Sequence, residues 1–149
     1  MSIMSATIYR LDTRFVVYPV STTTADVGIA SEPYIVLPTP VSAVDLGMAI
    51  NHALDSYRND VPHPTNWKGL SGPRLAAAGV RSEAALHKQA SMISVTRTGN
   101  TVSFTPQRNG GATGADKGFH ALDERAVTLD EPTQEAAGEA VLRVFNICN

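Results

Sequence analysis

Seven short segments of the chain carry the apolar and β-branched residues, several in strict alternation with polar ones, that are typical of β-strands with one buried face. They are residues 6–11, 15–20, 34–37, 92–97, 101–107, 119–122 and 126–129. The segments 92–97 and 101–107 are joined through Thr98, Gly99 and Asn100, which predicts a hairpin.

Two other segments repeat their apolar residues with the period of an α-helix. The matching positions are Leu46, Gly47, Ile50, Ala53, Leu54 and Tyr57 in the first, and Ala137, Gly138, Val141, Val144, Phe145 and Cys148 in the second. Ser42 is expected to cap the first helix, which runs to about Tyr57. Pro132 is expected to open the second, which runs to about Ile147.

The second half of the chain follows the first in this order of elements. We expect two strand-strand-strand-helix units at about residues 6–57 and 92–147, with a strand of each unit ended by a proline, Pro19 or Pro106. Residues 58–91 join the units through a loop and two short helices, the first opened by Pro73 and the second capped by Ser82. The prediction is an α+β fold in one domain, residues 1–149: an antiparallel sheet with two long helices on one face.

Composition adds limits to this prediction. The chain has 149 residues, 43% of them hydrophobic and 17% charged, and a single cysteine, Cys148, which rules out a disulfide within the chain. The first residues lack the basic start and apolar run of a signal peptide, and no stretch approaches the ~18 apolar residues of a membrane span. We therefore expect a soluble cytoplasmic protein.

The net charge of −2 conceals three blocks of opposite sign. Residues 1–57 carry five acidic and two basic residues. Residues 58–108 carry two acidic and seven basic residues, and residues 109–142 carry seven acidic and two basic residues. Two kinds of partner follow from this pattern, a basic protein on an acidic face or a nucleic acid on a basic one.

No sequence motif indicates an active site or a cofactor-binding site. The four histidines, His52, His63, His87 and His120, have no metal-ligand spacing, so neither a metal nor another cofactor is expected. Ser71 lies in Gly-Leu-Ser-Gly, which differs from the G-x-S-x-G motif of a nucleophile elbow because its last glycine comes one position too early. Residues 111–118 are glycine-rich without the spacing of a phosphate-binding loop. We expect a protein that is not an enzyme; a hydrolase built on Ser71 or His63 would need a pocket that no motif indicates.

Taken in order, eight segments resemble a family of bacterial immunity proteins from contact-dependent growth-inhibition systems, in particular those paired with ribonuclease-A-like toxin domains. The segments are RFVVYP, EPYIV, LGMAINHAL, DVPHP, LAAAGV, TPQRNGG, GF followed by Leu122, and GEAVLRVF, and they span about Arg14 to Phe145. The resemblance implies a small cytoplasmic protein that binds the toxic C-terminal nuclease domain of an effector and covers its active site.

Candidate contacts to such a toxin come from charge and from aromatic residues. Asp116, Asp123 and Glu124 lie in or near predicted loops, where carboxylates either form a solvated face or meet a basic partner. Trp67 lies in the loop of residues 59–72, which is rich in Pro, Gly and Asn, and serves either as buried packing or as an interface anchor. Tyr57 is a weaker candidate anchor because it also completes a helix face. The alternative function is a small nucleic-acid-binding module that uses residues 58–108.

Overall fold

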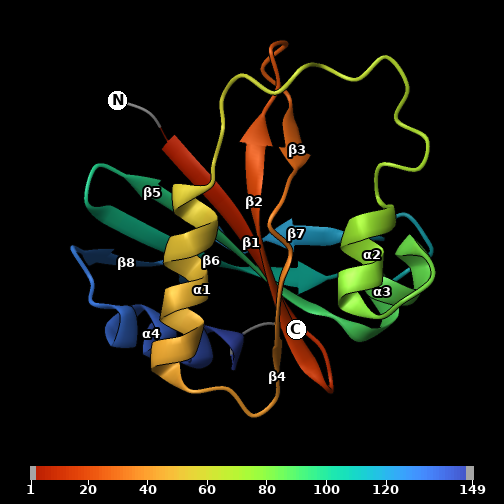
Figure 1. Cartoon of the computed structure of the whole chain (residues 1–149). Coiled ribbons are helices and arrows are strands. Elements are labelled where there is room, and N and C mark those ends of the chain that lie inside the picture. The colour runs from red at the N-terminus through yellow and green to blue at the C-terminus, as the bar shows by residue number, and fades with distance from the viewer. Residues whose placement is uncertain (1–2, 147–149) are drawn as a thin grey trace.

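The computed structural model describes residues 3–146 and shows an eight-stranded antiparallel sheet with four α-helices (Figure 1). The strands are β1 Ile3–Arg10, β2 Arg14–Thr22, β3 Gly28–Ala30, β4 Ile35–Pro38, β5 Ser91–Thr98, β6 Thr101–Asn109, β7 Phe119–Ala121 and β8 Val127–Asp130. The helices are α1 Ala43–Asp55, α2 Gly72–Ala78, α3 Glu83–Gln89 and α4 Gln134–Phe145, with a short 3-10 helix, η1, at Asp123–Arg125. The antiparallel α+β fold expected from the sequence is confirmed.

Two long strands each pair with three neighbours. Strand β2 pairs along one edge with β1, and along the other first with β4 and then with β3. Strand β6 does the same with β5, β8 and β7, and the pairing of β1 with β5 joins the two halves of the sheet. The order of pairing is therefore the same in both halves.

The expectation that Pro19 and Pro106 end their strands is wrong. Pro19 lies between the part of β2 that pairs with β4 and the part that pairs with β3, and its carbonyl accepts a hydrogen bond from Ser31 N at 3.0 Å. The Pro106 carbonyl accepts from Leu122 N at 2.9 Å. In a strand the N and O of one residue point the same way, so each proline nitrogen faces a gap between two partner strands, where no donor is required.

The starts of the helices agree with the capping residues predicted from the sequence to within two residues. Ser42 caps α1, its side chain accepting from Asp45 N at 3.1 Å, and Ser82 caps α3. Helix α4 begins after Thr133, whose hydroxyl accepts from Ala136 N, two residues later than the expected start at Pro132. Helix α1 ends at Asp55, before Tyr57. The expected end of α4 at Ile147, and Cys148, lie outside the described residues.

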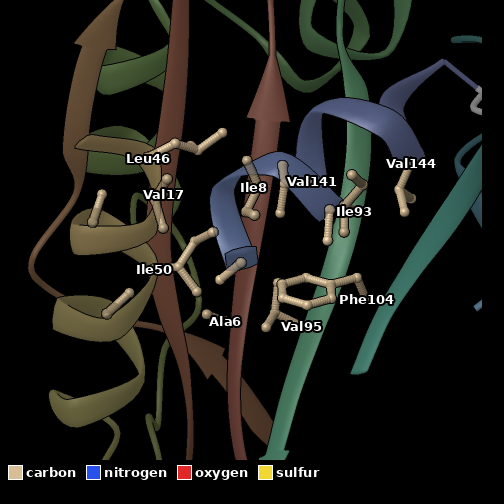
Figure 2. Close-up of a cluster of buried hydrophobic side chains, with 14 of the residues drawn as sticks. Ala6, Ile8, Val17, Leu46, Ile50, Ile93, Val95, Phe104, Val141 and Val144 are labelled. Atoms are coloured by element: carbon tan, nitrogen blue, oxygen red, sulfur yellow. The ribbon is translucent and has the colours of Figure 1, made fainter. Parts of the chain in front are cut away.

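Helices α1 and α4 pack together on one face of the sheet and bury the main core. Figure 2 shows side chains of β1 and β5, including Ile8 and Ile93, together with Phe104 of β6, between the sheet and the two helices. The helices approach closely at two glycines: a Cβ built on Gly47 would overlap the carbonyl of Gln134, and one built on Gly138 would overlap that of Ala43. Glycine at these positions sets the spacing between the helices.

The opposite face of the sheet carries α2 and α3, a layer that the sequence prediction did not assign to a face (Figure 1). Leu75 and Leu86 of these helices pack against apolar side chains of β1 and β2. The Tyr18 hydroxyl donates to the Tyr9 hydroxyl at 2.9 Å, and Arg74 Nη1 donates to Tyr9 at 3.0 Å. Burial raises the pKa of Tyr18 well above its ordinary value, so the Tyr18 hydroxyl keeps its proton and can donate to Tyr9.

Candidate interaction surface

Of the two residues considered for catalysis, His63 connects two parts of the chain, and Ser71 lines a small pocket of about 210 Å³. His63 Nδ1 lies 2.9 Å from Thr23 Oγ1 and thereby fixes the loop after α1 to the end of β2. Ser71 stands at the start of α2 without a side-chain capping bond. Within residues 3–146 no group of three histidine, cysteine or acidic side chains is arranged to hold a metal ion. Over the same residues, no helix has the length and apolar character needed to cross a membrane.

The basic block of the sequence, residues 58–108, is dispersed in space. Its arginines lie in the loop after α1, in α2, between α2 and α3, in β5 and in β6, and four of its seven basic residues form ion pairs. The pairs are Arg58 with Asp60 at 3.4 Å, Arg74 with Glu83, Arg97 with Asp55 at 2.6 Å and Arg108 with Asp116 at 2.5 Å. A nucleic-acid surface needs unpaired cations along one face. Among the described residues the block leaves Lys68, Arg81 and Lys88 exposed without an ion pair, which is fewer than half of its cations.

Two of the three carboxylates predicted to meet a partner are free of ion pairs among the described residues. Asp123 and Glu124 are exposed in η1. Asp116 instead receives two hydrogen bonds from Arg108, at 2.5 and 2.9 Å, and these hold the pKa of its carboxyl below the usual value. Its backbone carbonyl accepts a hydrogen bond from His120 Nε2 at 2.8 Å. Asp116 therefore connects residues of β6 and β7 through these hydrogen bonds, and Arg108 balances its negative charge.

Trp67 is exposed, so it does not serve as buried packing, and its role as an interface anchor stays a prediction. Its side chain is 47% exposed, stands edge-on to the ring of His63, and lines a pocket of about 210 Å³ beside β3 and Arg74. Leu70, 43% exposed, lines the same pocket. Tyr57 is half-buried, and its hydroxyl lies 2.6 Å from Thr22 Oγ1, so it fastens the end of α1 to β2. No hydrogen bond, ion pair or ring contact within residues 3–146 joins either aromatic residue to the acidic three.

A larger hollow of about 540 Å³ lies between α1 and β4. Its apolar lining comes from Ile35, Leu37, Met48 and Ala49, and its polar lining from Asp45, Asn51, His52, Asp55 and Gln134. A second hollow of about 400 Å³ shares three of these residues and adds Arg97, Asn100, Val102, Glu131 and Pro132. Because the two hollows share three lining residues, they adjoin each other, and together they are called here the α1 groove, with lining residues from β4, α1 and the β5–β6 hairpin.

The period of the α-helix explains why the α1 side chains that line the groove face away from the core. The residues Leu46, Ile50 and Leu54 form the buried stripe of α1. Asp45, Met48, His52 and Asp55 are spaced by three, four and three residues, so they form a neighbouring stripe along one side of the same helix. The sequence contains this spacing, but the apolar face of the helix, from which the helix was predicted, does not indicate the neighbouring stripe.

Comparison with known proteins places the fold. No protein-family model and no curated protein sequence matches the chain. A solved structure of a protein of unknown function from Neisseria meningitidis is 15% identical, with a TM-score of 0.77 over 99% of this chain and 96% of that one. A chain in the CdiA-CT/CdiI toxin and immunity complex from Yersinia pseudotuberculosis is 13% identical, with a TM-score of 0.76 over 100% of this chain and 99% of that one. This chain thus shares, from end to end, the fold of a chain found in a toxin and immunity complex.

Proposed function

We propose that this protein is an immunity protein, which binds a toxin domain and neutralises it. The observation that carries the proposal is the likeness of fold to a chain of a toxin and immunity complex, which leaves almost no residue of either chain unmatched. The order of sequence segments along the chain supports the same reading, since it resembles immunity proteins of contact-dependent growth inhibition.

We further propose that the partner is the toxic C-terminal nuclease domain of a growth-inhibition effector, and that binding in the cytoplasm covers its active site. A nuclease holds a polyanion, so the surface around its active site tends to be basic. Carboxylates that have no ion pair among residues 3–146, such as Asp123, Glu124 and Asp45, complement that charge. Protection against an enzyme requires tight binding, and a nanomolar complex corresponds to about −12 kcal/mol.

The proposal is tested by purifying the protein from its native cells at high salt and identifying what remains bound. We expect one effector C-terminal domain in near-equal amount, toxic when produced alone and harmless when produced together with this protein. A nucleic acid that is lost as salt rises, without a protein partner, would contradict the proposal and favour the nucleic-acid alternative. A captured domain whose toxicity persists on co-production would contradict neutralisation.

Charge reversal in η1 tests the acidic contacts. We propose that Asp123 and Glu124 attract the partner during its approach, and that the double variant D123K/E124K therefore associates about tenfold more slowly at low salt. Asp116 contributes less, because Arg108 balances its charge. Stopped-flow or surface-plasmon-resonance association rates at several salt concentrations make the measurement.

The control is D12K/E139K, which changes the net charge equally at two exposed acidic positions outside η1. It should slow association less than the η1 variant. Equal slowing by both variants would show that only net charge matters, and equal rates for wild type and D123K/E124K would remove η1 from the approach surface.

A further inference from the structure

The α1 groove is lined by apolar side chains, of which Met48 is exposed, and by carboxylates, called here its rim, and this combination identifies the chemistry of what binds there. We propose that the groove receives a basic segment of the partner: an apolar side chain of that segment lies against Met48, and its lysines or arginines face the carboxylates of the rim. The identity of the partner as a toxin rests on the proposed function, whereas the chemistry of the segment follows from the groove itself.

The apolar part of the argument rests on Met48. It is 51% exposed, although the core of α1 is already filled by Leu46, Ile50 and Leu54. Val44, one turn earlier on the same side, is 40% exposed. Folding does not explain two large apolar side chains on the outer side of a helix, and methionine adapts its shape readily to an apolar partner.

The charge of the rim gives the sign of the partner. Asp45, Asp55 and Glu131 line the groove, together with a single guanidinium, Arg97, whose side chain is only 19% exposed. Arg97 contacts Asp55 through one carboxylate oxygen, and the Asp55 side chain remains 68% exposed. Glu131 accepts a hydrogen bond from Asn100 at 3.0 Å and has no ion pair within the described chain. An excess of carboxylate favours lysine and arginine and repels a nucleic acid.

The surface around Trp67 is the rival, and its charge has the opposite sign. Its pocket has no carboxylate among its lining residues, and the next residue after Trp67 is Lys68, which has no ion pair among the described residues; Arg74 also lines the pocket but pairs with Glu83. A basic segment would meet like charge there, which costs affinity. The two exposed apolar surfaces are therefore distinguished by electrostatics, and the α1 groove is the one suited to a basic segment.

The groove is tested first with a probe that does not depend on the toxin. A short peptide of alternating lysine and leucine, and its counterpart of glutamate and leucine, are titrated into the labelled protein while backbone amide resonances are followed. We expect the lysine peptide to shift resonances of residues 44–55 and 131–135, and expect those shifts to be lost in Met48→Lys. Shifts around residues 67–74 instead, equal shifts with the glutamate peptide, or no binding at all would overturn the proposal.

The second test uses the captured toxin domain and two matched variants. Met48→Lys and Leu70→Lys each replace an exposed apolar side chain by lysine, one in the groove and one beside Trp67. Thermal unfolding checks that both fold. We expect Met48→Lys to weaken binding at least thirtyfold, as expected of a central contact, and Leu70→Lys to change it less than threefold. The reverse ranking would assign the interface to the Trp67 surface. Peptide binding in the groove without a captured toxin would instead contradict the proposed function and leave the groove in place.

Discussion

Replacing Gly47 by alanine is expected to lower the free energy of unfolding by about 3 kcal/mol, a large loss for one methyl group. The added Cβ would overlap the carbonyl group of Gln134 in α4. A backbone carbonyl cannot rotate away as a side chain can, so α1 and α4 would have to separate and loosen the core that both cover. Gly138→Ala should cost about as much, because its Cβ would meet the carbonyl of Ala43. Urea denaturation followed by circular dichroism measures both.

The matched control is Gly72→Ala, also in a helix, where a Cβ would meet no atom within 4 Å. This variant should be neutral or more stable by up to about 1 kcal/mol, since alanine is the better helix former. Similar losses in Gly47→Ala and Gly72→Ala would mean that the close approach of α1 and α4 does not limit stability. Because Gln134 also lines the α1 groove, separation of the helices should weaken partner binding in Gly47→Ala as well.

Replacing Phe104 by alanine should lower the free energy of unfolding by about 3–5 kcal/mol. Phe104 is fully buried, and it lies in β6 between Val95 of β5 and Val127 of β8. Its ring fills the space between the sheet and the helices in Figure 2, where the surrounding side chains come from several elements and cannot collapse together. The cavity left behind adds to the lost transfer free energy.

Phe119→Ala provides the comparison for this core substitution, since it removes the same side chain from a half-buried site on the other face of the sheet. Phe119 packs against Tyr9 and His87 with ring centroids 6.2 and 5.0 Å apart. We expect a loss of about 1–2 kcal/mol there, because part of the ring is already in water. Equal losses at the two sites, measured by urea denaturation, would contradict the assignment of the main core to the α1–α4 side.

Much of the candidate surface could not be predicted from the sequence, because it depends on contacts between residues that are far apart in the chain. Asp116 was predicted as a contact to a partner, yet Arg108 eight residues earlier binds it in two hydrogen bonds. Arg97 belonged to a basic block, yet it pairs with Asp55 across 42 residues. Whether Trp67 was buried or exposed followed from the path of its loop. The α1 groove needed β4, α1 and the start of α4 to be placed together.

What the sequence by itself determined were features whose cause lies within a few residues. Alternating strands β5 and β6 meet at Gly99, whose φ of 61° suits the tight turn, and Ser42 and Ser82 cap their helices through bonds to backbone amides three residues on. The tertiary structure alone decided the rest. Pro19 and Pro106 stay inside strands because each faces a gap between two partner strands, and Gly47 and Gly138 set the spacing of α1 and α4 because backbone from the opposite helix lies against them. Such effects arise between residues far apart in the chain, where periodicity and capping patterns carry no information.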